Sequence, residues 1–294
     1  MTTRTCIPTL KVAAVLAALT LTAGCTGTTG DGESTSPVPT TSTPATATAS
    51  PTPPAEAGGA TAWFVVDTRA GLRLARDDWT GQAGGEAGVR AAVESMIDGP
   101  ADPDYSTSWN PDTDVLSVDI ADEVITVDLS EDARTANVGS PGAALMIQQL
   151  VWTATEGAET PDAAVVLLIE GEPAGELWGA VTWEGPVARE DPMDVRTLVQ
   201  LERPLAGEVL SAGSVTISGD AAAFEANVPW RILDAEGAEV EAGFTMTSEG
   251  QTFAPFSFEV ELPAGEYVVE ISEDDPSDGA AGTPMVDTRS FTVE

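Results

Sequence analysis

The apolar positions in the first half of the chain alternate between strand and helix patterns. Trp63 to Val66 is a short apolar run that predicts a strand. Apolar residues then recur at helical spacing from Glu86 to Ile97, and Asp98-Gly99-Pro100 predicts the end of that helix. Two segments of strict alternation follow, Asp114 to Ile120 and Val124 to Leu129, and the three residues between them suit a hairpin.

A second helix and a buried strand complete this half. Ser140-Pro141 predicts an N-cap and first turn for a helix that continues to about Thr155. Val165 to Ile169 is apolar throughout and predicts a buried strand, which Glu170 to Pro173 turns. The order strand, helix, strand, strand, helix, strand predicts an α+β domain with one mixed sheet and its helices on one face. Leu116, Val118 and Ile120 should share one face of the first alternating strand. Ile125, Val127 and Leu129 should share one face of the second.

The second half is patterned as short strands separated by turn residues, which is typical of an all-β immunoglobulin-like sandwich. The predicted strands are Val199–Leu201, Ser214–Ile217, Val228–Leu233, Val240–Thr245, Phe256–Leu262, Tyr267–Ile271 and Ser290–Val293. The two cysteines of the chain are Cys6 and Cys25. Trp230 should therefore pack in this sandwich without the disulfide that antibody domains use.

The N-terminus has the features of an export signal. Arg4 and Lys11 precede an apolar run from Val12 to Leu21 that is too short to span a bilayer. The following Thr22-Ala23-Gly24-Cys25 resembles the bacterial lipoprotein signal, in which the cysteine is alkylated by diacylglycerol and becomes the new N-terminus. Thr22 departs from that pattern, which usually has an aliphatic residue there. The expected location is the outer face of the membrane of a Gram-positive-type envelope, and the alternative is ordinary cleavage to a soluble secreted protein.

These patterns divide the chain into four segments. We expect a signal peptide over residues 1–24 and a Thr-, Ser-, Pro- and Ala-rich linker over residues 25–60 that cannot bury a core and should be disordered. An α+β domain over 61–194 and an immunoglobulin-like domain over 195–294 should follow.

Composition narrows the classes of partner. The chain has 12 Lys and Arg against 48 Asp and Glu, a net charge of −36, and no histidine. Loss of residues 1–24 would leave 10 basic residues, all arginine, and a net charge of −38. This acidity argues against nucleic-acid partners and against docking on anionic lipid, so membrane contact is expected through lipid at Cys25 alone.

The same inventory argues against most catalytic chemistry. Without histidine, a mature lysine or a free thiol, the chain cannot build the usual nucleophilic triads, Schiff bases, or His- and Cys-ligated zinc sites. We therefore expect no enzyme activity, no catalytic residue, no cofactor and no metal. Two alternatives stay open: calcium held by Asp112-Thr113-Asp114 or Asp274 to Gly279, and a cell-wall hydrolase that uses two carboxylates.

Five short blocks of the first domain resemble the GerMN domain, which is named from sporulation and germination lipoproteins. The blocks are Met96–Pro100, Leu116–Val118, Val124–Ser130, Gln149–Thr153 and Ile169–Pro173. The resemblance implies a small α+β fold similar to ring-building motifs and no known catalytic activity. It leaves homo-oligomer formation open.

The second domain resembles Gmad2, an immunoglobulin-like module that commonly follows GerMN. The blocks that carry this resemblance are Pro204–Gly207, Ser218–Ala221, Phe224–Val228, Asp234–Gly237 and Asp275–Gly279. The two domains occur here in the order that is usual for the family.

Five residues are candidates for a binding surface: Phe224, Glu225, Asn227, Trp178 and Trp183. A structural role for the first three is favoured, with Phe224 in the sandwich core and the polar pair satisfying backbone groups. Trp178 and Trp183 flank a glycine-bearing segment and are the tryptophans most expected to be exposed. The sequence favours a non-enzymatic scaffold or protein-binding module whose partners are envelope proteins or cell-wall components, with a solute- or glycan-binding lipoprotein as the alternative.

Overall fold

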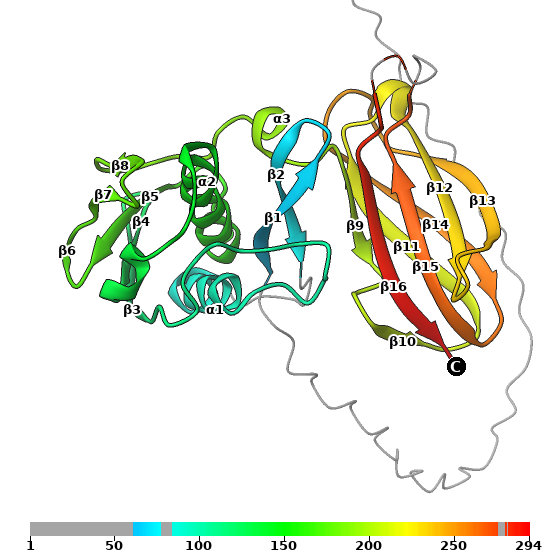
Figure 1. Ribbon diagram of the computed structural model, residues 1–294, viewed down its shortest axis with the longest axis horizontal. Helices are drawn as coiled ribbons and strands as arrows, with labels where there is room; N and C mark the ends of the chain where they lie inside the picture. The colour runs from blue at the N-terminus through cyan, green and yellow to red at the C-terminus, as the bar shows by residue number, and fades with distance from the viewer. Residues whose placement is uncertain (1–60, 78–83, 276–279, 281) are drawn as a thin grey trace, which may run out of the picture. The chain divides into compact units, whose positions relative to one another are not determined.

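The computed structural model describes residues 61–77, 84–275, 280 and 282–294, all of which belong to one compact unit, Ala55–Glu294 (Figure 1). Cys25 and the segments predicted to be a signal peptide and a linker lie outside the described residues. No helix in the described part of the chain is long and apolar enough to cross a membrane.

A mixed sheet of four strands forms the centre of the first domain. Its strands run in the order β3 (Val115–Ala121), β4 (Val124–Leu129), β5 (Ala164–Ile169) and β6 (Glu172–Pro173). β4 and β5 are parallel, and the other pairs are antiparallel. Ile125, Val127 and Leu129 are all buried on one face, as their alternation predicts.

Two helices, α1 (Gly85–Asp98) and α2 (Ser140–Gly157), share the hydrophobic core formed by that sheet face. The two helices approach closely at small residues, because a Cβ atom added to Gly157 would lie 2.7 Å from the carbonyl oxygen of Gly88. Gly139, rather than Ser140, occupies the N-cap position of α2, and Pro141 lies in the first turn. The remaining short elements are η1 (Glu131–Arg134), β7 (Gly175–Leu177), β8 (Val181–Trp183) and α3 (Pro192–Val195).

Two details of the first domain differ from the sequence prediction. β1 (Ala62–Thr68) does not join the four-stranded sheet, because it pairs instead with β2 (Gly71–Asp77), a strand that the sequence did not predict. In β3 a register shift between Val115 and Ser117 leaves Leu116 44% exposed, so this residue does not share the inner face with Val118 and Ile120.

The second domain is a sandwich of two sheets, as predicted. The larger sheet has the order β10 (Glu208–Leu210), β16 (Val286–Val293), β15 (Gly265–Ser272), β12 (Asn227–Asp234) and β13 (Glu239–Met246). The smaller sheet has the order β14 (Ala254–Leu262), β11 (Gly213–Ala221) and β9 (Val199–Arg203). All seven predicted strands are present, and β10 is an additional one.

Trp230 packs near the open side of this sandwich rather than at its centre. Its ring stacks on Phe258 of the opposite sheet with centroids 4.5 Å apart. A Cβ atom on Gly243, the residue paired with Trp230 on β13, would lie 2.7 Å from the indole. The stack of Trp230 on Phe258 therefore connects the two sheets, and Gly243 leaves room for the indole beside it.

Candidate functional site

The exposed candidate Phe224 does not lie in the core. It belongs to the short 3-10 helix η2 (Phe224–Ala226) before β12 and is 43% exposed, so the favoured structural reading of this residue is wrong. Glu225 is also exposed and has a φ of 51°, an uncommon conformation for a side chain of this type. Asn227 is half-buried at the start of β12. The three residues thus occupy a surface corner of the sandwich.

The two tryptophan candidates belong to the structure of the first core. Trp183 is 3% exposed, so the expectation that it is exposed is wrong; β8 carries it into the hydrophobic cluster. Trp178 is half-buried, donates a hydrogen bond from its indole to the carbonyl of Ala133 (3.0 Å) and meets Trp109 edge-on. These contacts explain both residues without a ligand.

Acidic side chains gather at one hollow of the first domain. Glu94, Asp98 and Asp114 line this hollow, whose volume is about 320 Å³. Among the residues that the structure describes, no three acidic, histidine or cysteine side chains are placed to hold a metal ion. The second acidic segment considered for calcium, Asp274 to Gly279, lies partly outside the described residues.

The hollows of the sandwich are small for a solute site. Two of them have volumes of about 360 and 380 Å³, which is near the lower end of the range for small-molecule pockets. In the smaller of the two, Arg203 already pairs with Glu208 at 3.4 Å. Neither hollow supplies an observation in favour of a solute- or glycan-binding protein.

The densest polar arrangement lies where the two domains meet. Thr197, in the segment that joins them, donates its backbone N–H to the carbonyl of Leu74 on β2 (2.9 Å). The hairpin of β1 and β2 thus contacts α2 on one side and the segment leading into β9 on the other (Figure 1).

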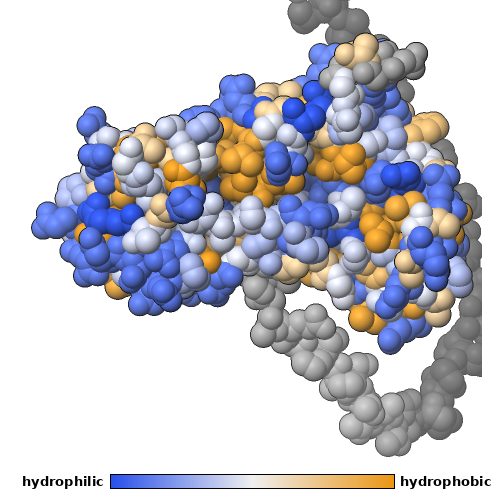
Figure 2. Space-filling model, viewed as in Figure 1, coloured by the Kyte–Doolittle hydropathy of each residue, from blue (hydrophilic) through white to orange (hydrophobic). Residues whose placement is uncertain are grey.

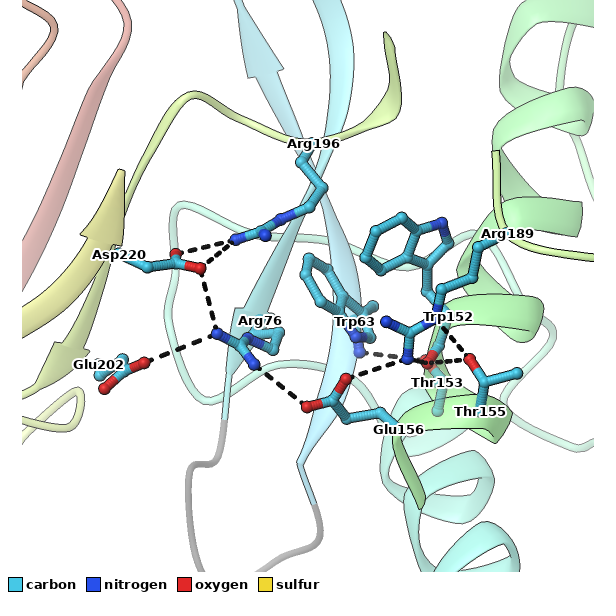
Figure 3. A network of polar contacts seen from close by, with 10 residues as sticks. All are labelled: Trp63, Arg76, Trp152, Thr153, Thr155, Glu156, Arg189, Arg196, Glu202 and Asp220. Carbon is cyan, nitrogen blue, oxygen red and sulfur yellow. Dashed lines mark hydrogen bonds and ion pairs between the residues drawn. The ribbon is translucent and has the colours of Figure 1, made fainter. Parts of the chain in front are cut away.

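A network of three arginines and three carboxylates occupies this junction (Figure 3). Glu156, at the end of α2, accepts from Arg76 at 3.1 Å and from Arg189 at 3.0 Å. Arg76 also reaches across to the sandwich, where its Nη2 lies 3.4 Å from Asp220 and 3.6 Å from Glu202.

Arg196 closes this network from the joining segment. Its Nη2 lies 2.8 and 2.7 Å from the two carboxylate oxygens of Asp220. Its guanidinium also covers the ring of Trp63 at 4.9 Å and that of Phe253 at 3.8 Å. Trp63 in turn packs edge-on against Trp152, with centroids 4.8 Å apart. The cations are therefore enclosed by aromatic faces as well as by carboxylates.

Burial and the charges of neighbouring partners act in opposite directions on the pKa values of four groups of this network. Burial lowers the pKa of Arg196 and of Arg189 from the usual arginine value, although Asp220 and Glu156 oppose it. Burial favours the neutral form of Glu156, but the attraction of Arg76 and Arg189 outweighs it and lowers the pKa of that carboxyl. Burial raises the pKa of Glu202, which Arg76 only partly offsets.

A second cluster, formed by Arg289 of β16 and the groups around it, is more deeply buried. The Arg289 side chain is fully enclosed and forms an ion pair with Asp102 of the first domain. Asp77 and Asp287 lie at 3.8 and 3.9 Å from its guanidinium. The hydroxyl of Tyr105 donates to Asp287 at 2.8 Å, so a side chain of the first domain is bonded directly to the sandwich.

The cluster around Arg289 holds three carboxylates against one cation, and the pKa values of two of them, Asp102 and Asp287, are raised. Burial raises the pKa of Asp287 to about 6, although Arg289 and the hydrogen bonds from Leu201 and Tyr105 oppose the shift. Burial likewise raises the pKa of Asp102, and it raises the pKa of Tyr105 well above its usual value. The junction is therefore a place where protonation and domain contact are coupled.

A third contact crosses between the domains outside these clusters. Arg69, at the turn between β1 and β2, donates to both carboxylate oxygens of Glu273 at 3.0 and 2.9 Å. Each of the described arginines Arg69, Arg76, Arg196 and Arg289 thus joins the sandwich domain to a residue outside it. Sequence reasoning missed these arginines, because their partners lie 24 to 204 residues away. The one available signal was how few basic residues the chain has.

Comparisons with known proteins agree with the two domains described above. Residues 64–175 match the family model Germane, described as sporulation and spore germination. Residues 198–280 match the model Gmad2, described as an immunoglobulin-like domain of bacterial spore germination. Both matches confirm the resemblances and the fold class drawn from the sequence, and neither is to an enzyme family.

The solved structures that are weakly similar to this chain include the following three. Two contain domains of the sporulation protein GerM from Bacillus subtilis. The tandem GerMN domains are 18% identical, with 45% of this chain and 45% of that chain covered and a TM-score of 0.35. The first GerMN domain alone is 21% identical, with 45% and 98% covered and the same TM-score of 0.35.

The third is a putative lipoprotein from Clostridium perfringens, 17% identical, with 46% and 90% covered and a TM-score of 0.32. The chain thus spans less than half the length of the tandem GerM structure. A search of curated proteins found no match.

Proposed function

We propose that this chain, a GerMN-like domain followed by a Gmad2 immunoglobulin-like domain, is a lipid-anchored envelope protein that acts as a non-enzymatic scaffold or protein-binding module. The observation that carries the proposal is the junction between the two domains. Ion pairs that are largely closed from solvent connect them there, as with Arg289 and Asp102, whose side chains are 0% and 2% exposed.

Buried ion pairs contribute little to the net free energy of folding, but they hold their partners in one defined geometry. Removing two charges from water costs about as much as their attraction returns, so such a pair is tolerated only when its partners are held in place. A junction that joins Arg76 to Glu156 and Asp220, and Arg289 to Asp77 and Asp102, therefore fixes one orientation of the two domains. A fixed orientation is what a scaffold needs if it presents two surfaces to other molecules.

The charged groups of the junction are committed to one another, which argues against a catalytic role for them. Glu156 and Asp220 each bind two arginines. Asp287 accepts hydrogen bonds from Tyr105 and Leu201. A general acid or base has to reach a substrate proton from a cleft, and these carboxylates are instead occupied by internal partners.

The N-terminal sequence supports a location outside the membrane. Cys25 would carry the lipid, and residues 26–60, if extended at about 3.1 Å per residue, would reach on the order of 100 Å from the membrane surface. The two domains would then be presented within or beyond the cell wall.

The proposal is tested by capture from envelope extracts with the unit Ala55–Glu294 immobilised through an added C-terminal tag. We expect a defined envelope component to be retained by the native sequence and lost with Asp220→Asn, which loosens the junction. Glu270→Gln, which removes an exposed ion pair remote from the junction, is the matched control and should retain the component. Reproducible hydrolysis of envelope material without retention of a partner would overturn the proposal.

A further inference from the structure

The edge strand β13 exposes a row of apolar side chains. Phe244 is 69% exposed, Met246 56% and Val240 48%, on a strand that pairs in its sheet, among the described residues, with β12 alone and whose Thr245 side chain also contacts Ser257 of β14. β13 ends the order of the larger sheet and lies at its outer side in Figure 1. Figure 2, by comparison, shows apolar patches divided by hydrophilic side chains on the face that it presents. An exposed apolar edge of this kind marks an interaction site.

The main chain of β13 is also open along the same residues. Thr247 donates its N–H to the carbonyl of Ala226 at 2.9 Å, which makes these two residues a hydrogen-bonded pair. Along an antiparallel pair of strands, residues whose main-chain groups bond to the partner strand alternate with residues whose main-chain groups point away from it. Gly243 and Thr245 therefore bond to β12. The N–H and C=O groups of Ala242, Phe244 and Met246 point to the open edge.

The features of β13 that hinder its pairing with another strand end at Glu241. The segment Glu239–Glu241 contains a register shift and two glutamates, both of which hinder pairing with another strand. The segment Ala242–Met246 has no lysine, no proline and no charge.

The other edges of the sandwich are better protected. β10 is only three residues long, β14 presents Pro255, Glu259 and Glu261 on its exposed side, and β9 is in contact with β16 and with β2 of the first domain. The unprotected stretch is thus confined to one half of β13.

We propose that this stretch pairs antiparallel with β13 of a second copy of the chain, joining two five-stranded sheets into one. Phe244 then lies opposite Phe244 of the second copy, and Ala242 lies opposite the second copy's Met246. This register pairs the whole stretch Ala242–Met246 with itself, keeps residues with open main-chain groups opposite one another and stays clear of the register shift.

The sequence of Ala242–Met246 is suited to pairing with the same segment of a second copy. The pairing places an aromatic residue against an aromatic residue and the small Ala242 against the large Met246. Glu241 faces Thr247 of the second copy, so no two carboxylates oppose each other within the paired stretch.

Such a dimer is weak in solution, because it buries much less than the roughly 1,600 Å² of a standard interface and both copies are strongly acidic. If the chain is anchored through Cys25 as proposed above, confinement to a membrane raises the effective concentration. The pairing itself does not depend on that anchoring.

Disulfide trapping tests the register directly. The unit Ala55–Glu294 contains every described strand and no cysteine, so Phe244→Cys introduces a single thiol. Hydrogen-bonded antiparallel partners lie with Cα atoms about 5.5 Å apart, within the range of a disulfide. We expect mild oxidation to give a covalent dimer of Phe244→Cys. Val209→Cys, which places a thiol at a 59% exposed position on the opposite edge of the same sheet, is the control and should stay monomeric.

Sedimentation of the native sequence is the complementary measurement. We expect concentration-dependent dimer formation that strengthens as salt is added, is lost in Phe244→Lys and is retained in Val209→Lys. Thermal unfolding of each variant shows that it is folded, as expected for exposed positions. A native chain that stays monomeric, a dimer that survives Phe244→Lys, or equal trapping of the two cysteine variants would each overturn the proposal. Binding of an envelope component through Phe244 by a monomeric chain would assign the edge to another partner.

Discussion

Arg196 and Asp220 form an ion pair whose atoms lie 2.8 and 2.7 Å apart and whose side chains are only 7% and 13% exposed. Arg196 belongs to the segment that joins the two domains, and Asp220 belongs to the central strand of the smaller sheet. The same carboxylate accepts from Arg76 of the first domain. One aspartate therefore holds the joining segment and the β1–β2 hairpin to the sandwich.

Replacement of Asp220 should loosen the junction. Asp220→Asn removes the carboxylate that pairs with the largely buried Arg196 and one of the three carboxylates around Arg76, so we expect a loss of about 2–4 kcal/mol in the free energy of unfolding. Urea unfolding followed by tryptophan fluorescence measures this loss, because Trp63 and Trp152 lie within the network.

The control for Asp220→Asn is the exposed pair of Arg231 and Glu270. The Arg231 side chain is 47% exposed, so Glu270→Gln should cost less than about 1 kcal/mol. Similar losses in the two variants would contradict the importance given to the buried network.

The raised pKa of the Asp287 carboxyl predicts that the free energy of unfolding depends on pH. Burial raises its pKa to about 6, against about 4 for aspartate in an unfolded chain. The stability that this group contributes is therefore fully present below about pH 4 and is lost as the pH rises through about 6. Relative to Asp287→Asn, the native protein should gain about 1.4 kcal/mol in the free energy of unfolding between about pH 7.5 and about pH 5. Equal slopes in the two proteins would show that Asp287 is not the group responsible.

The close approach of α1 and α2 can be tested with alanine at two glycines of α2. A Cβ atom on Gly157 would lie 2.7 Å from a backbone oxygen of α1, whereas a Cβ atom on Gly142 would lie 3.5 Å from Val138, an ordinary contact. Gly157→Ala should lower the free energy of unfolding by about 1–3 kcal/mol. Gly142→Ala should raise it by up to about 1 kcal/mol, because alanine favours the helix. Thermal unfolding of both variants measures these changes. A Gly157→Ala variant that is more stable than the native protein would contradict the close packing of α1 and α2.

The position of Phe224 predicts that its loss is nearly neutral for stability. A Phe→Ala change in a core costs about 3–5 kcal/mol, and we expect that cost at Phe256, which is 3% exposed. Phe224→Ala should cost less than about 1 kcal/mol, since the ring is already 43% exposed. If denaturant unfolding instead gave similar losses for the two variants, Phe224 would have to be a core residue after all.

Lipid attachment at Cys25 is tested by metabolic labelling with a clickable fatty acid. We expect the native chain to be labelled and to fractionate with membranes, and Cys25→Ala to lose both properties. Unchanged labelling of the Cys25→Ala variant would refute the attachment site. A chain that is secreted without label would favour cleavage as an ordinary signal peptide.

The sequence predicted the strands of the sandwich well, because period-two patterns there coincide with turn residues on both sides. It did not predict β2, where Leu74 and Ala75 are both buried although they are adjacent. That strand is covered on both faces, by α2 and by the segment leading into the second domain, and only the fold brings these coverings together.

The candidate site was less predictable than the fold. Trp183 lies in a glycine-bearing segment that resembles an exposed loop, and it is buried only because β8 returns it to the first core. Arg76 and Arg289 read as ordinary surface charges in the sequence. Their partners Asp220 and Asp102 are 144 and 187 residues away, and local patterns carry no information about such distant pairs.

The enclosure of arginine at the junction has a consequence for the field around the molecule. Arg76, Arg196 and Arg289 have side chains that are 14% exposed or less, so three of the few cations in a chain of net charge −36 are withdrawn from the surface. Their partners Asp77, Asp102 and Asp220 are enclosed with them, so these charges offset one another inside the junction, and the acidic residues that remain on the surface set the potential seen from outside. Polyanions such as nucleic acids and phosphate-rich polymers are repelled at long range, whereas cationic molecules are drawn toward the protein before any specific contact forms.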